Sequence, residues 1–185
     1  MEIPSNVVLW TLGGLAGNLK STNHYENNKG YHLKCKTNNK YLIWEKGQVS
    51  VNLDFDAAPQ TKVHFHLPDG KEREILSGEP VAFAIGMGEA YLHYGSQPFG
   101  INLKWSTAPV HEWRVFGANG KKGQPIPTGA PCALVNDKVE PDADFLVFME
   151  KHAPKVADLG WTTSPDWLKN LANKAATGVV KAIMA

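Results

Sequence analysis

The stretch YLHYGSQPFGINLKWSTAPVHEW, from Tyr91 to Trp113, decides the fold because the chain contains two further versions of it. An earlier version begins at Tyr41 as YLIWEKGQVSVNLDFDAAP, and a later one begins at Phe145 as FLVFMEKHAPKVADLGWTTSPDW. Each version has an aromatic-Leu pair, then a Leu-x-aromatic triplet, then a proline four residues after the triplet's aromatic. These features keep their order at intervals of about 50 residues, which predicts an internal repeat.

Each repeat unit opens with a glycine and a segment of alternating apolar residues. These segments are GYHLKCK from Gly30, GEPVAFAIG from Gly78 and GAPCALVND from Gly129. In the second segment Val81 and Phe83 alternate with smaller residues, so the period is two residues. This period predicts half-buried antiparallel strands joined by turns, about four short strands in each unit.

Three units of about 50 residues with four strands each resemble the β-trefoil, in which three hairpins cap a closed six-stranded barrel. The resemblance implies an all-β domain that has no open sheet edge and pools three small apolar faces into one core. We therefore expect a β-trefoil domain over residues 1–166, with repeats at about 30–77, 78–128 and 129–166.

The third unit differs from the others because no closing strand follows Pro165. The segment SNVVLWTLGG around Trp10 resembles HEWRVFGANG around Trp113, so we expect residues 5–13 to close the barrel beside the third unit. Residues 167–185 have apolar residues at helical spacing and three lysines without an acidic residue. They predict an amphipathic C-terminal helix, which either packs on the barrel or lies on an anionic membrane surface or a partner.

Large apolar residues recur at equivalent positions of the three units, as a threefold core requires. The predicted core takes residues from the aromatic-Leu strands, the triplets and the closing strands: Leu42, Trp44, Leu92, Tyr94, Leu146 and Phe148; Phe55, Trp105 and Trp161; and Trp10, Val63 and Trp113.

Polar residues at equivalent positions are a different case, because a core does not require them. Asn52, Asn102 and Asp158 each precede the leucine of the triplet and are expected to point outward. An amide or carboxylate beside an aromatic ring can hold a sugar through its hydroxyl groups while the ring stacks on its apolar face. The alternative is a hydrogen bond that fixes the hairpin loop.

Two loops of the middle unit, 95–100 and 106–112, combine polar groups with an aromatic ring and complete the predicted ligand site with Gln97, Phe99, His111 and Glu112. The ricin-type sugar-binding branch of the β-trefoil carries Gln-x-Trp near the end of each unit. This chain has HEW there instead, with Glu112 directly before Trp113, so the motif is absent. The aromatic-Leu starts of the units are more similar to the fascin-like and agglutinin-like branches.

The residues His64 and His66 in VHFHL alternate on a predicted strand, so both side chains project from one face. One metal ion can reach such a pair if a third ligand is close, whereas the alternative is a hydrogen-bonded strand face without metal. The sequence contains neither Gly-x-Ser-x-Gly nor a glycine-rich phosphate loop. We therefore predict no enzyme activity, no metal and no cofactor.

The formal net charge of the chain is only +1, which does not predict binding to nucleic acid. Its two cysteines, Cys35 and Cys132, are too few for a disulfide framework. The N-terminus MEIPSNVVLWTLGG has no basic region before its short apolar run and is not typical of a signal peptide. We expect a soluble protein in the cytoplasm, or one secreted without a leader.

These patterns together favour a non-enzymatic, lectin-like protein that recognises carbohydrate through surface loops of a β-trefoil. Two alternatives remain. One is a protein–protein interaction module, such as a protease-inhibitor-like trefoil or an accessory protein of a toxin or effector. The other is a protein that contacts a membrane surface weakly through residues 167–185. The predicted partner is a glycan or a protein.

Overall fold

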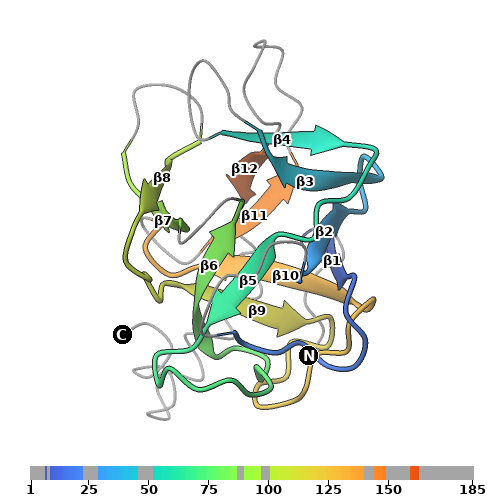
Figure 1. Cartoon of the computed structure of the whole chain (residues 1–185), viewed down its shortest axis with the longest axis vertical. Coiled ribbons are helices and arrows are strands. Elements are labelled where there is room, and N and C mark those ends of the chain that lie inside the picture. The colour runs from blue at the N-terminus through green and yellow to red at the C-terminus, as the bar shows by residue number, and fades with distance from the viewer. Residues whose placement is uncertain are drawn as a thin grey trace.

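The computed structural model describes residues 7, 9–22, 29–45, 52–86, 90–96, 101–139, 144–148 and 159–162. All the secondary-structure elements within these ranges are β-strands. They form one antiparallel sheet that curls into a half-barrel (Figure 1). The same ranges hold no helix that could cross a membrane. The all-β prediction is therefore confirmed, whereas the helix predicted at residues 167–185 lies outside the described residues.

The strands follow the repeated features of the sequence. The opening segments form β2 (His32–Cys35), β6 (Pro80–Ile85) and β10 (Pro131–Asn136). The aromatic-Leu pairs and triplets form three hairpins: β3 (Lys40–Trp44) with β4 (Leu53–Asp56), β7 (Tyr91–Tyr94) with β8 (Leu103–Ser106), and β11 (Asp144–Phe148) with β12 (Leu159–Thr162). The other strands are β1 (Trp10–Gly13), β5 (Val63–His66) and β9 (Trp113–Gly117).

The N-terminal strand β1 lies between β2 and β10. Trp10 is paired with Cys35 on one side and with Cys132 on the other. Likewise β9 lies between β6 and β10, with Trp113 paired with Val81 of β6. The strand β1 therefore pairs with β10, the opening segment of the predicted third unit, as the likeness of the segments around the two tryptophans predicts. Closure of a barrel by this strand stays a prediction. Residues 5, 6 and 8 of the predicted strand lie outside the described residues.

The strand β5 is held on both sides as well. It pairs with β6 along its whole length. At its start, Val63 and Tyr31 exchange two backbone hydrogen bonds, of 2.8 and 2.9 Å, which join β5 to the segment that leads into β2.

Three connecting segments, 17–21, 73–77 and 124–128, meet in a cyclic set of backbone hydrogen bonds, which we call the junction ring. Each segment donates one N–H to a carbonyl of the next: Ser21 to Arg73, Ser77 to Gln124, and Thr128 to Gly17, at 2.9, 2.8 and 2.9 Å. Each also buries one aliphatic side chain, at most 2% exposed: Leu19, Ile75 and Ile126.

The inner faces of the strands form one apolar core, which matches most of the predicted residues. The leucines of the aromatic-Leu pairs and the three closing-strand residues are at most 1% exposed: Leu42, Leu92, Leu146, Trp10, Val63 and Trp113. The triplet aromatics Phe55, Trp105 and Trp161 are partly buried and pack against this core. Trp44 and Tyr94 are half-buried, and the side chain of Phe148 lies outside the described part of the structure.

The two core tryptophans of β1 and β9 also have the same polar contact. The indole N–H of Trp10 donates to the carbonyl of Leu146 at 2.7 Å, and that of Trp113 donates to the carbonyl of Leu92 at 2.8 Å. Each bond runs from a closing strand to the leucine of an aromatic-Leu pair. It therefore ties a strand of the half-barrel to a hairpin.

Candidate functional site

The asparagines predicted to bind sugar lie at the start of the return strands of their hairpins. The carbonyl of Asn52 accepts the N–H of Glu45 at 2.9 Å, and the carbonyl of Asn102 accepts the N–H of Gly95 at 3.1 Å. The φ angle of Asn52 is 48°, in the left-handed region that asparagine adopts more readily than most residues. Both contacts are made by backbone carbonyls, and the role of the two side-chain amides stays a prediction. Asp158 lies outside the described residues.

Glu112 belongs to a buried polar network. It is 6% exposed, and its carboxylate accepts hydrogen bonds from the backbone N–H of Tyr94 and, at 3.1 Å, from the side-chain amide of Asn136. The carboxylate therefore joins β7 to the end of β10 and is not directed at solvent. Gln97 and Phe99, the other polar and aromatic members of this predicted site, lie outside the described residues.

His111 is half-buried beside this network. Its Nε2 is buried and has no hydrogen-bond partner in the part of the chain that the structure describes. Burial lowers the pKa of His111, and a hydrogen bond with the backbone of Leu67 offsets part of this change. The imidazole is therefore neutral at pH 7.

His64 and His66 both project away from the core from β5, on the one face that the sequence predicts. His64 is 2% exposed and its Nδ1 lies 3.3 Å from the hydroxyl of Thr22. The ring of His66 packs edge-on against Tyr91, with 5.1 Å between the ring centres. Among the described residues, no group of three or more His, Cys, Asp or Glu side chains is arranged to hold a metal ion.

A cavity of about 580 Å³ opens beside the first segment of the junction ring, and we call it the junction cavity. Its described lining comes from four stretches of chain and from β5: Leu15 and Ala16; Lys20, Ser21 and Thr22; Lys29 and Tyr31; Glu72 and Arg73; and His64. Its volume lies within the range of about 300–1,000 Å³ that is usual for small-molecule sites.

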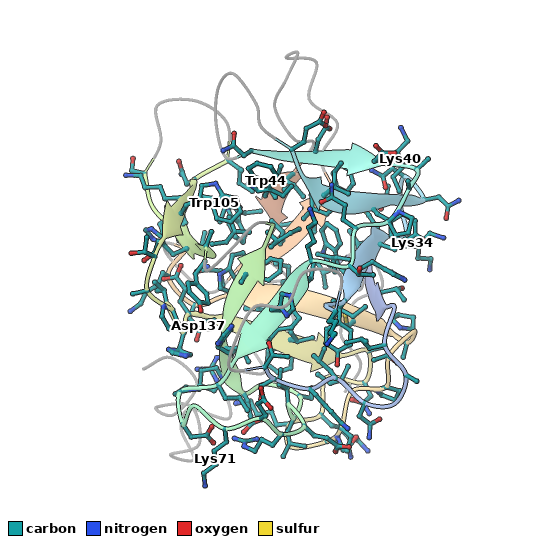
Figure 2. The ribbon with its side chains drawn as sticks, viewed as in Figure 1. Lys34, Lys40, Trp44, Lys71, Trp105 and Asp137 are labelled. Atoms are coloured by element: carbon teal, nitrogen blue, oxygen red, sulfur yellow. The ribbon has the colours of Figure 1, made fainter. Side chains whose placement is uncertain are left out.

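Part of the lining of the junction cavity, Glu72 and Arg73, directly follows Lys71 in the chain. The labelled residue Lys71 is at the lower end of the molecule in Figure 2, and its carbonyl accepts a hydrogen bond of 2.7 Å from the hydroxyl of Ser21 in the cavity wall. Trp44, Trp105 and Lys40 are labelled towards the upper end. These three residues therefore lie at the other end of the molecule from Lys71.

Hydrogen bonds hold the wall made by Lys20, Ser21 and Thr22. The N–H of Lys20 donates to the phenolic oxygen of Tyr31 at 2.9 Å, and the N–H of Thr22 donates to the carbonyl of Phe65 at 2.9 Å. The hydroxyl of Ser21 accepts the N–H of Arg73 at 3.0 Å. This wall is therefore fixed before any ligand enters, which lowers the ordering cost of binding.

Ion pairs hold the part of the lining made by Arg73. The guanidinium of Arg73 makes a two-pronged contact with the carboxylate of Glu79, at 3.0 and 2.9 Å, and its Nε lies 3.1 Å from Asp69. The hydrogen bonds that Arg73 donates to Glu79 raise the pKa of Arg73 above its ordinary value, and the one that it donates to Asp69 adds to the effect. Arg73 is therefore a rigid part of the wall, and two carboxylates balance its charge.

The apolar anchors of the repeat do not include the residues that line this cavity. A further pattern, aliphatic-x-hydroxyl, stands before the second and third units and after β1: Leu19-Lys20-Ser21, Ile75-Leu76-Ser77 and Ile126-Pro127-Thr128. These triplets form the junction ring, so the pattern would have identified it. The cavity itself depends on which segments the fold brings beside the first triplet. No spacing in the sequence predicts which segments these are.

Comparisons with protein families, with curated proteins and with solved structures found no match for this chain. The geometry of the described residues is therefore the basis for the functional argument that follows.

Proposed function

We propose that this chain is a β-trefoil protein that binds carbohydrate without catalysing a reaction, and that its ligand site is the junction cavity. The fold part of the proposal is supported by the strand pairings. Successive pairings run from β1 to β2, from the segment before β2 to β5, and on through β6, β9 and β10 back to β1. Such a circuit, with hairpins formed by the remaining strands, is what a trefoil barrel requires.

Threefold recurrence of single contacts is the second support for this fold. Each closing strand pairs with the opening segment of its own unit at one equivalent position: Tyr31–Val63, Val81–Trp113 and Cys132–Trp10. The junction ring repeats one backbone hydrogen bond three times in a cycle. An approximate threefold axis through the barrel accounts for both sets of contacts.

The composition of the junction cavity is the observation that carries the binding function. Eight of the ten described lining residues are polar or charged, and Leu15 and Ala16 are the apolar ones. A sugar offers many hydroxyl groups around a ring with apolar C–H faces, so it needs several donors and acceptors and a small apolar contact. Lysine, tyrosine and threonine supply donors here, and Glu72 supplies an acceptor.

The hydroxyl groups in the wall support binding in preference to nucleophilic catalysis. The hydroxyl of Ser21 lies 2.7 and 3.1 Å from the carbonyls of Lys71 and Arg73, where its one proton is shared. A serine nucleophile instead donates its proton to a general base. Ser21 is therefore a structural link between the first segment of the junction ring and the second.

A steric block of the cavity tests the proposal. Ala16 is an exposed residue of the cavity lining, and Ala118 is an exposed residue in the turn after β9. We expect Ala16→Trp to abolish binding on a glycan array of neutral and acidic sugars, and Ala118→Trp to leave it unchanged. Equal binding by both variants contradicts the placement of the site. An array without any signal for the unmodified protein contradicts carbohydrate binding.

A further inference from the structure

Tyr31 lies at the boundary between the apolar core and the junction cavity. The residue is 3% exposed, packs in the core cluster and also lines the cavity. Its N–H donates to the carbonyl of Val63 at 2.8 Å, and its carbonyl accepts the N–H of Val63 at 2.9 Å. The backbone of Tyr31 is therefore fixed to β5, and its ring is held by the core.

The phenolic oxygen of Tyr31 accepts the backbone N–H of Lys20 at 2.9 Å. Burial raises the pKa of Tyr31 above its ordinary value and the bond from Lys20 offsets part of this change, so the phenol keeps its proton at neutral pH. Within the described part of the chain, no hydrogen bond gives this proton an acceptor. Since buried donors are normally paired, an oxygen atom inside the cavity, of solvent or of a ligand, completes the bonding of the phenol.

The other two junctions show what the fold itself requires at this place. At the second junction the N–H of Leu76 donates to the carboxylate of Glu79 at 2.8 Å, as the N–H of Lys20 donates to Tyr31. At the third junction the residue is Pro127, which has no N–H. The fold therefore needs at most an acceptor here. The phenolic proton of Tyr31 is an additional feature of the junction beside the cavity.

The charged residues of the lining offer little to an ionic ligand. Two carboxylates already pair with Arg73, and Lys29 and Glu72 each interact with another group of the protein. Of the lysine, arginine and acidic residues in the described lining this leaves Lys20, which is exposed, so its ammonium group is solvated. Burial of an ionic group without a committed counter-charge is costly, so this lining favours a neutral ligand.

From these contacts we propose that the ligand of the junction cavity is a neutral saccharide, and that one of its oxygen atoms accepts the phenolic proton of Tyr31. The inference rests on the proposed function. A sugar hydroxyl suits this place because its oxygen accepts the proton while its own proton remains for a second bond. Leu15 and Ala16 supply an apolar contact for the ring face of the sugar.

NMR chemical-shift titration of the full chain with methyl glycosides tests this inference. The neutral probes are methyl glucoside, methyl galactoside and methyl mannoside. Methyl glucuronide and methyl glucosaminide carry a negative and a positive charge, and glycerol is a polyol without a ring. We expect a neutral glycoside to bind more tightly than the charged ones and than glycerol.

Replacement of Tyr31 by phenylalanine keeps the ring in the core and removes the phenolic oxygen. We expect Tyr31→Phe to raise the dissociation constant of the neutral glycoside by about three- to tenfold, which corresponds to one neutral hydrogen bond. The control Tyr41→Phe makes the same change on β3, outside the described lining, and should alter it by less than about twofold. Circular dichroism shows that each variant is folded. In the unmodified protein the Cζ resonance of Tyr31 should shift on binding, a measurement that needs no variant.

Monodeoxy forms of the tightest neutral glycoside separate a contact with Tyr31 from an effect on the fold, because Tyr31→Phe also removes the acceptor of the Lys20 N–H. Removal of the hydroxyl that contacts Tyr31 should weaken binding to the unmodified protein without weakening binding to Tyr31→Phe further. Removal of any other hydroxyl should weaken both proteins equally. An equal loss for every sugar, without this coupling, assigns Tyr31 to the fold alone and overturns its contact with the ligand.

The remaining outcomes separate this inference from the function on which it rests. If methyl glucuronide or methyl glucosaminide binds more tightly than every neutral glycoside, the neutral class is overturned and carbohydrate binding stays intact. Equal dissociation constants for the unmodified protein and Tyr31→Phe overturn the role of Tyr31 only. If glycerol binds as tightly as the glycosides, or if no sugar binds the unmodified protein, both the inference and the proposed function fail.

Discussion

Replacement of Trp113 by phenylalanine tests whether the indole bonds hold the hairpins on the barrel. Trp113 is 1% exposed, and its N–H donates to the carbonyl of Leu92 at 2.8 Å. Phenylalanine cannot donate this bond, so the carbonyl loses a buried partner at a cost of about 1–3 kcal/mol. The smaller ring also loses packing worth about 1 kcal/mol. We therefore expect the free energy of unfolding to fall by about 2–4 kcal/mol.

Trp105 provides a matched control in the same hairpin unit. It packs against the same core, but its indole nitrogen is buried without a hydrogen-bond partner in the described part of the structure. Trp105→Phe removes an unsatisfied donor, and this offsets the loss of packing. We therefore expect the free energy of unfolding to change by less than about 1 kcal/mol. Trp10→Phe should resemble Trp113→Phe, because its indole donates the equivalent bond to Leu146 at 2.7 Å.

Urea unfolding followed by circular dichroism measures these differences without relying on the tryptophan signal that the substitutions change. The change of Trp113→Phe corresponds to a melting temperature lower by about 4–16 °C for a chain of this size. A Trp105→Phe variant that loses as much stability as Trp113→Phe would refute the reasoning. In that case ring volume, and not the hydrogen bond, would account for both effects.

Three further predictions concern other parts of the barrel. Gly86→Ala should lower the free energy of unfolding by about 2–4 kcal/mol in a urea titration. The glycine has a φ of 110°, and a Cβ at this position would lie 2.6 Å from the ring of Trp44. An unchanged free energy of unfolding contradicts this prediction. Burial raises the pKa of the Cys132 thiol to about 12, so iodoacetamide at pH 8 should label it only after denaturation, as mass spectrometry of the native protein would show. Burial also raises the pKa of Asp137, although the guanidinium of Arg114 lies 2.7 Å away. The folded state then holds this proton more tightly than the unfolded chain, so the contribution of the carboxyl to stability falls as pH rises above about 4. The loss of stability caused by Asp137→Asn should accordingly be smaller at pH 7 than at pH 4, and the opposite order would contradict the sign.

The strands and much of the core follow from the sequence because they depend on local alternation repeated three times. Leu42, Leu92 and Leu146 are buried as the aromatic-Leu anchors predict. The likeness of the segments around Trp10 and Trp113 predicts the pairing of β1 with β10, which is a contact between distant parts of the chain. Repetition makes such a contact predictable, because the closing strand seen in the first two units reveals that the third unit lacks one.

The candidate site does not follow from the sequence, because polar residues have several possible partners and only the fold selects among them. In the sequence Glu112 looks like a sugar-binding carboxylate beside an aromatic residue. In the structure its carboxylate accepts hydrogen bonds from Tyr94 and Asn136. Lys20 and Lys29 are separated in sequence and carry no motif, yet they line one cavity. A polar side chain can bind a ligand only where the fold has not already paired its donors and acceptors. Which groups are paired depends on the packing of segments that are not neighbours in the chain.

The threefold arrangement that we propose also separates residues that the fold needs from residues that it tolerates. Leu19, Ile75 and Ile126 are buried at equivalent places, so packing explains them fully. Lys20 has no such explanation, since the fold accepts Leu76 and Pro127 at the same place. An exposed lysine on a segment fixed by backbone hydrogen bonds adds little to stability, because exposed charges contribute at most about 1 kcal/mol. Packing of the junction ring therefore accounts for the three aliphatic residues and not for Lys20, so substitution at Lys20 separates a role in the junction cavity from a role in the fold.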